Sequence, residues 1–318
     1  MDPAEKCAQS TRLSRRRVEF FAVPIIVLGA GAIGSVYGAK LSTSNDVTLL
    51  ARSAHADAIN RDGLRITGAD EGTYRVRAAT SLDALAPDTL IVLTTKVSDS
   101  EAAVRAIAHL IRPDTIVLCV QNGLYSEEIV KAIVGDRSVV LRAITHVGAI
   151  FRTPGVVELK VRGATRIEQS APSAAIAELF TRCGLEAQVT DRIKDEMWQK
   201  LVVNCVINPV NAITRTEVGA IADERLRPLK QLIVEECRRV AARDGVELAG
   251  NFVDEIDRQY GPSRNVSSMQ QDLLKGRRTE IDFLNGAVVR LGARYGIECP
   301  VNQALAAIIT AMERASAT

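Results

Sequence analysis

A glycine-rich turn that follows an apolar run constrains the fold of this chain more than any other feature. Residues 23–28 are apolar and lead directly into the G-x-G-x-x-G string Gly29-Ala30-Gly31-Ala32-Ile33-Gly34. Between a buried strand and a helix, such a string binds the pyrophosphate of a dinucleotide, because its glycines allow a tight turn, a close ligand and close helix packing. A glycine-rich turn without a ligand is the alternative, and the context favours binding. The predicted cofactor contacts here are Gly29, Ala30, Gly31, Ala32, Ile33 and Gly34.

Strand-like and helix-like runs alternate from this turn to about residue 190. The strand-like runs are 47–50, 90–94, 115–120 and 138–144, and helix-compatible stretches such as 34–41 and 99–111 separate them. This alternation predicts a parallel, doubly wound sheet of the Rossmann type. Residues 156–161 and 164–169 predict an antiparallel pair across Arg162-Gly163.

Beyond about residue 191 the pattern becomes entirely helical. Segments 197–207, 226–243 and 267–295 have helical periodicity, and Ser267 with Gln270 has the spacing of a capping box. We expect Pro209 to end the first of these helices. The predicted fold class is therefore α/β, with an N-terminal Rossmann-type doubly wound parallel sheet followed by an all-α C-terminal domain. The predicted organisation is a flexible extension at 1–21, an NADP-binding domain at 22–190 and a helical substrate-binding, catalytic domain at 191–318.

Charge and composition exclude several classes of protein. The 40 basic and 38 acidic residues nearly cancel, whereas a nucleic-acid-binding protein carries a clustered basic excess. The one basic run, 12–17, is interpreted as a solvated tail. Six dispersed cysteines without a Cys-x-x-Cys pair, and three dispersed histidines, predict neither a disulfide framework nor a metal site. No apolar stretch approaches the roughly 18 residues of a membrane span, so we expect a cytoplasmic protein.

The end of the second predicted strand distinguishes the two nicotinamide dinucleotides. Enzymes that use NAD carry an acidic residue there, about 20 residues after the glycines, which accepts from the ribose hydroxyl. Here residues 47–51 lead into Arg52 instead. A guanidinium group can pair with a 2′-phosphate, so the sequence favours NADP(H), with an exposed surface arginine as the alternative.

A polar stripe lies on the helix that contains Trp198. Lys200, Asn204 and Asn208 are spaced at i, i+4 and i+8 among apolar residues, so they share one face of the helix. Such a stripe is costly unless it meets partners or a ligand. Spacing alone leaves two interpretations equally open: a site for a small oxygen-rich ligand, or a solvated lysine with asparagines that bridge neighbouring helices.

From residue 23 onward the chain resembles the ketopantoate reductase (2-dehydropantoate 2-reductase) family. The matching blocks are 28–34, 94–96, 121–123 (Gln-Asn-Gly), 198–209, and 267–272 together with 278–286. The resemblance implies an NADPH-dependent oxidoreductase that acts on CH–OH groups and reduces ketopantoate to pantoate in pantothenate and coenzyme A biosynthesis.

The resemblance also implies residue roles. Lys200 matches the general acid that protonates the C2 oxygen of the keto acid, and Glu280 matches a carboxylate near the nicotinamide. The implied cofactor contacts beyond the glycine turn are Arg52, Lys96, Asn122, Gly148 and Glu280. The implied substrate contacts are Asn122, Lys200, Asn204, Asn208, Asn265 and Ser268. Local alternatives are a turn-forming Asn122, a solvated Lys96, a capping Ser268, and an ion pair of Glu280 with Arg277 or Arg278.

One position departs from the family pattern. Many members carry a substrate-binding asparagine before the glycine that corresponds to Gly219, and here that residue is Val218. Losing an amide from a polar pocket changes which substrates fit, so a different branched 2-keto acid or ketoester is the first alternative. A non-catalytic NADP(H)-binding sensor is the second. We expect a small-molecule substrate as partner, with no nucleic acid and no membrane, and a homodimer remains an open alternative.

Overall fold

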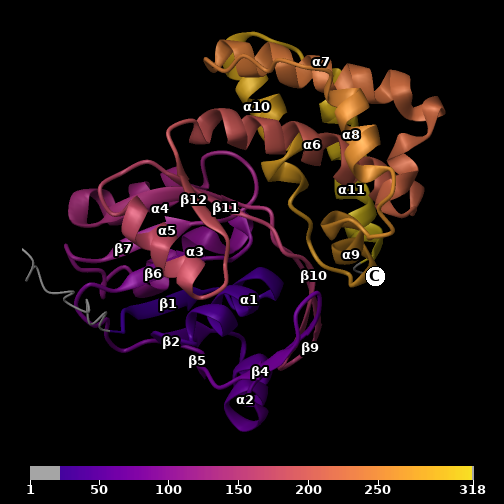
Figure 1. Ribbon diagram of the computed structural model, residues 1–318. Helices are drawn as coiled ribbons and strands as arrows, with labels where there is room; N and C mark the ends of the chain where they lie inside the picture. Colours follow the sequence, from indigo (N-terminus) through magenta and orange to yellow (C-terminus); the bar gives the residue numbers. More distant parts are fainter. Residues whose placement is uncertain (1–21, 317–318) are drawn as a thin grey trace, which may run out of the picture.

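The computed structural model describes residues 22–316, so the predicted N-terminal extension and its basic run lie outside the described residues. Its larger sheet has eight strands in the order β12-β11-β8-β7-β6-β1-β2-β5 (Figure 1). Their bounds are β1 Pro24–Leu28, β2 Asp46–Leu50, β5 Arg77–Ala79, β6 Leu90–Leu93, β7 Ile116–Cys119, β8 Val139–Thr145, β11 Thr165–Glu168 and β12 Ala187–Thr190. All neighbouring strands run parallel except β8 and β11, which are antiparallel. The Rossmann-type α/β fold is confirmed.

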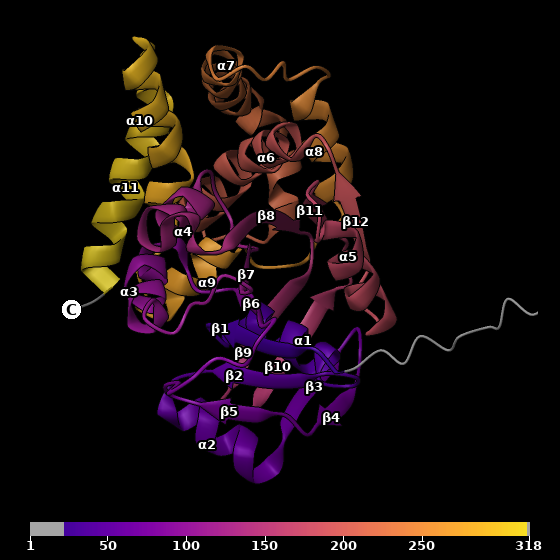
Figure 2. The same ribbon diagram turned by 90° about the vertical axis from the view of Figure 1, so that its left-hand side faces the viewer.

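Helices cover both faces of this sheet (Figure 2). Residues of α1 (Ala32–Leu41), α2 (Ser53–Asp62) and α5 (Ser173–Arg182) belong to one core cluster, and residues of α3 (Val97–Ile107) and α4 (Ser126–Val134) belong to another. Strand β1 serves both clusters, because successive side chains of a strand point to opposite faces. Ile25 and Val27 join the first cluster, and Ile26 and Leu28 join the second.

A second, four-stranded sheet has the order β4-β3-β10-β9. Its strands are β3 Leu64–Gly68, β4 Gly72–Tyr74, β9 Gly148–Thr153 and β10 Val156–Val161. The predicted pairing of 156–161 with 164–169 is therefore wrong, since β10 pairs with β9 and β3 whereas β11 pairs with β8 and β12. The chain crosses between the sheets at Gly163, where a Cβ atom would lie 2.2 Å from the carbonyl oxygen of His146.

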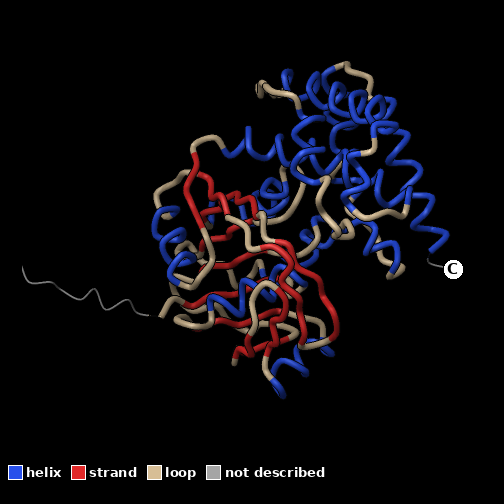
Figure 3. Tube along the Cα trace, turned by 45° about the vertical axis from the view of Figure 1, so that its right-hand side comes forward, coloured by secondary structure: helices blue, strands red, loops and turns tan. Residues whose placement is uncertain are grey.

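The rest of the described chain is helical (Figure 3). Its helices are α6 Ile193–Thr214, α7 Arg227–Arg243, α8 Phe252–Tyr260, α9 Ser268–Leu274, α10 Asn285–Tyr295 and α11 Pro300–Ser316, with 3-10 turns at Val218–Ala222, Glu224–Leu226 and Ile281–Phe283. A further 3-10 turn, Gly135–Arg137, lies between α4 and β8. Trp198 of α6 is fully buried in their shared core. Among residues 22–316, no helix combines the length and the apolar character that crossing a bilayer demands.

Two predictions about the helical part are wrong and one is confirmed. Helix α6 continues through Pro209 to Thr214. The predicted helix 267–295 is interrupted after Leu274, where Gly276 takes a φ of +59° that favours glycine. The Ser267 cap is confirmed, because its side-chain oxygen accepts from the backbone N–H of Gln270 at 3.3 Å.

Candidate active site

The glycines of the turn between β1 and α1 have different surroundings: two are closely packed and one faces open space. A Cβ atom on Gly29, which has a φ of +102°, would lie 2.6 Å from Thr95, and one on Gly34 would lie 2.4 Å from the Gly29 carbonyl oxygen. A Cβ atom on Gly31 would meet no atom of the described chain within 4 Å. The first turn of α1 contains no acidic residue. Its free backbone N–H groups therefore face a space that suits an anion.

Arg52 and Lys96 each follow a strand of the large sheet, yet their surroundings differ. Arg52 precedes α2 and is exposed. Its backbone carbonyl oxygen accepts from the N–H groups of His55 and Ala56, but its guanidinium group makes no hydrogen bond or ion pair with the described residues. Lys96 precedes α3 and reaches across to the helical part. Its ammonium lies 2.7 Å from Asp272 of α9 and donates to the carbonyl oxygen of Arg278 at 2.6 Å. Lys96 is therefore held in place rather than free in solvent.

Glu280 joins two loops at the carboxyl edge of the sheet. It accepts a hydrogen bond from the Asn122 side-chain amide at 3.3 Å and one from the backbone N–H of Val97 at 3.4 Å. The alternative of an ion pair with Arg277 or Arg278 is not seen among the described residues, and Arg278 pairs with Asp282 at 2.9 Å. This carboxylate thus links the helical part to the ends of β6 and β7.

A small pocket lies between the loop after β7 and helix α6. It is lined by Gln121, Asn122, Gly123, Arg142, Ile144, Met197, Lys200, Leu201 and Asn204. The Lys200 ammonium donates to the carbonyl oxygen of Thr145 at 2.7 Å. The Asn204 amide makes no hydrogen bond with the described residues, so it is available to a ligand. We refer to this space as the lysine pocket.

The surroundings of Lys200 lower the pKa of its ammonium group. Desolvation and then the positive charge of Arg142 lower the pKa of Lys200 to about 8, although Glu280 acts in the opposite direction. Desolvation disfavours the charged form of an amine, and a like charge adds to that effect. An ammonium with such a pKa is a competent proton donor near neutral pH.

A second small pocket lies beside α9. It is lined by Ser268, Met269, Asp272, Glu280 and Leu284. The Asn122–Glu280 hydrogen bond connects its wall to that of the lysine pocket.

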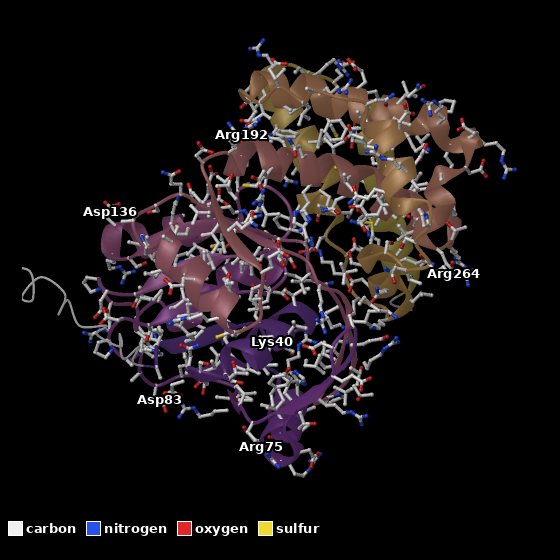
Figure 4. The ribbon with its side chains drawn as sticks, viewed as in Figure 1. Lys40, Arg75, Asp83, Asp136, Arg192 and Arg264 are labelled. Atoms are coloured by element: carbon white, nitrogen blue, oxygen red, sulfur yellow. The ribbon has the colours of Figure 1, made fainter. Side chains whose placement is uncertain are left out.

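Figure 4 labels Arg192, which precedes α6, and Arg264, which precedes α9, on two sides of the helical part.

Other candidate residues do not line either pocket. Asn208 is buried, with 7% of its surface exposed, and its side chain has no hydrogen-bond partner among the described residues. Asn265 is exposed, and its carbonyl oxygen accepts from the backbone N–H of Val218 at 2.8 Å. Val218 itself is buried in the helical core. Gly148 begins β9, where an added Cβ would lie 3.3 Å from Val161.

The sequence interpretation missed three residues of the site, namely Arg142, Thr145 and Asp272. Arg142 carried a usable signal, since it is a charged residue in the middle of the apolar run of β8. Thr145 takes part through its carbonyl oxygen, which no residue type reveals. Asp272 was recognised only as part of a matching block.

Asp244, at the end of α7, fixes the two walls of the lysine pocket relative to each other. It accepts hydrogen bonds from the Tyr125 hydroxyl at 2.5 Å, the Trp198 indole N–H at 2.8 Å and the Tyr295 hydroxyl at 2.9 Å. Tyr125 follows the Asn122 loop, and Trp198 precedes Lys200 on α6. One buried carboxylate therefore holds both segments.

Comparison with known proteins identifies the family of this chain. Residues 25–172 match the family model described as ketopantoate reductase PanE/ApbA, and residues 192–313 match the model of its C-terminal part. The chain belongs to the ketopantoate reductase family. This is a family of oxidoreductases that act on CH–OH groups.

Curated members of the ketopantoate reductase family align with nearly the whole chain. The 2-dehydropantoate 2-reductase of Pyrococcus horikoshii is 37% identical over 297 residues, which cover 91% of this chain and 97% of the relative. The enzyme of the same name from Archaeoglobus fulgidus is 33% identical, with 90% and 97% coverage.

Solved structures of similar fold include enzymes with different names. A PanE/ApbA family ketopantoate reductase from Ralstonia eutropha JMP134 superposes with a TM-score of 0.87 at 30% identity, and covers 93% of this chain and all of its own. A D-mandelate dehydrogenase solved with NADH and anilino(oxo)acetate has a TM-score of 0.86 at 28% identity, with 93% and 100% coverage.

Proposed function

We propose that this protein is an NADPH-dependent reductase of a small 2-keto acid, and that ketopantoate is its substrate. The observation that carries the proposal is that Lys200, Asn122 and Asn204 line one pocket at the carboxyl edge of a Rossmann-type sheet, the edge at which such sheets bind their ligands. Residues 22–190 would bind the cofactor, and residues 191–318 would supply most of the substrate contacts.

The glycine turn fits a nicotinamide dinucleotide. The open space at Gly31 and the free N–H groups of α1 suit a pyrophosphate. Arg52 stands where enzymes that use NAD carry an acid, and its guanidinium group, which has no partner in the part of the chain that the structure describes, suits a 2′-phosphate. When bound there, a reduced dinucleotide would supply the hydride.

The chain's own residues would handle the proton and the orientation of the substrate. The Lys200 ammonium would give its proton to the C2 oxygen as that oxygen becomes an alkoxide, because its pKa of about 8 lies close to neutral pH. The side-chain amide of Asn204 has no partner among residues 22–316 and would bond the hydroxyl or carbonyl of the substrate. Ser268 is exposed beside Glu280 and would face the substrate carboxylate.

Glu280 would act on the turn that carries Asn122 rather than on the proton. Its carboxylate already accepts from the Asn122 amide, which fixes the orientation of that side chain. The side-chain carbonyl oxygen of Asn122 would then be free to face the lysine pocket, which Asn122 lines. Lys96, held by Asp272, would close the cofactor side of the cleft.

One observation favours a different keto acid within the same chemistry. The lysine pocket has an apolar wall formed by Ile144, Met197 and Leu201, and a fold neighbour is a D-mandelate dehydrogenase. A branched or aromatic 2-keto acid would pack against that wall. Ketopantoate and such acids therefore need to be compared directly.

The deciding experiment is a panel of 2-keto acids assayed with NADPH and with NADH, on the full chain and on Lys200→Ala. We expect the highest kcat/KM for ketopantoate with NADPH, and a loss of at least about a hundredfold in Lys200→Ala, the scale of general-acid catalysis. Tight NADPH binding without turnover of any acid would overturn the proposal in favour of a non-catalytic sensor.

A further inference from the structure

A buried arginine lies behind the lysine pocket, and the proposed chemistry has not used it. Arg142 is on β8, and only 3% of its surface is exposed. A buried charge is costly unless it is paired and hydrogen-bonded. The free-energy cost of burying this guanidinium group must therefore be offset by the groups that surround it.

The guanidinium group binds the backbone on both sides of Asn122. Its Nη1 donates to the carbonyl oxygen of Cys119 at 3.0 Å, and its Nη2 donates to the carbonyl oxygens of Gln121 at 2.5 Å and Gly123 at 2.9 Å. Gly123 has a φ of +80°, a conformation that favours glycine. Three carbonyls held by one planar group fix the turn from which the Asn122 side chain projects.

The same group brings charge to the lysine pocket, whose wall it shares with Lys200. Its Nε lies 3.5 Å from Glu127 of α4, whose side chain is 12% exposed. The other charged or titratable groups that act on Lys200 are Glu280, ahead of the last 3-10 turn, and His146, which follows β8. Arg142 is thus a permanent cation whose ion-pair partner is Glu127, and the carboxylates of Glu168 and Glu280 also act on it.

We propose that Arg142 is a positioning residue of the reductase, which fixes the turn that carries Asn122 and keeps a permanent positive charge beside Lys200. The inference rests on the proposed function, because it assigns Arg142 to the support of Lys200 as proton donor. A like charge disfavours the ammonium form of Lys200, so it favours proton release to the substrate oxygen.

Three substitutions separate the effect of the charge of Arg142 from that of its three hydrogen bonds to the Asn122 turn, which we call the clamp. Arg142→Met removes both, Arg142→Lys keeps the charge but cannot reproduce the planar donor fork, and Glu127→Gln keeps the clamp while removing the counter-charge. Two readouts apply to each variant. The first is the basic limb of the kcat/KM profile against pH, and the second is the titration of Lys200 by NMR of 13C-labelled lysine without cofactor, assigned with Lys200→Met.

The two charge changes have opposite expected effects. Arg142→Met raises the pH at which Lys200 titrates by on the order of one unit, and Glu127→Gln lowers it, because one removes a cation and the other an anion. Arg142→Lys titrates near the wild-type pH, yet it loses about tenfold or more in kcat/KM since the Asn122 turn is less well placed.

Shifts in the same direction, or no shift, in Arg142→Met and Glu127→Gln would overturn the inference, because a purely structural role predicts no dependence on the sign of the charge. If Arg142→Met does not fold, Glu127→Gln decides the matter. Failure of the proposed function is seen separately, as a wild-type protein that reduces no 2-keto acid, whereas the NMR titration tests the charge relation without turnover.

Discussion

The side-chain amide of Asn285 donates to the carbonyl oxygen of Cys205 at 3.0 Å, and Cys205 is the residue four positions before Pro209. Proline has no N–H group, so the i+4 donor that this carbonyl oxygen would ordinarily have in a helix is missing. The amide from α10 replaces the missing donor, and α6 continues to Thr214. Helix α6 therefore continues past Pro209 because a tertiary hydrogen bond replaces the one that proline removes.

We expect Asn285→Ala to lower the free energy of unfolding by about 1–3 kcal/mol, the cost of a buried acceptor without a partner. Urea denaturation would measure the change. Pro209→Ala is the matched background, because it restores the N–H group of the helix. The loss caused by Asn285→Ala should be smaller there, and equal losses in both backgrounds would refute this explanation.

The pH profile tests the assignment of Lys200 as a general acid. A lysine whose pKa is lowered to about 8 is protonated below that pH and loses its proton above it. We therefore expect kcat/KM to be flat below about pH 8 and to fall about tenfold per unit above it. The residual rate of Lys200→Ala should not fall in this way at high pH. An unchanged fall in that variant would mean that another group is responsible for it.

Arg52 is expected to select the phosphorylated cofactor. Arg52→Ala should weaken NADPH binding by about tenfold or more, the value of a charge-assisted hydrogen bond, and should leave NADH binding nearly unchanged. Fluorescence titration with both dinucleotides measures this ratio. Arg61→Ala is the control, because Arg61 is an exposed arginine at the other end of α2 that pairs with Asp62. A parallel loss for both dinucleotides would contradict the prediction.

The glycines of the turn should respond differently to a single methyl group. Gly31→Ala meets no described atom within 4 Å, so stability should be preserved while cofactor affinity falls, because the methyl occupies the space assigned to the pyrophosphate. Gly34→Ala would place its Cβ 2.4 Å from the Gly29 carbonyl oxygen. It should cost about 1–3 kcal/mol of stability, as overpacking does. Thermal unfolding with and without NADPH separates the two effects. Unchanged NADPH affinity in Gly31→Ala would mean that the pyrophosphate does not bind at Gly31.

The local pattern of the chain determined its α/β class, the glycine turn and the helical face of Lys200, Asn204 and Asn208, because strand and helix periodicities and turn chemistry are properties of neighbouring residues. The contacts between distant segments were decided by the tertiary structure alone. It placed β10 and β11 in different sheets, carried α6 through Pro209 by means of Asn285, and set Arg142 beside Lys200. The reason is physical: these arrangements depend on burial and on hydrogen bonds between groups far apart in sequence, which balance only when the packed core brings them together.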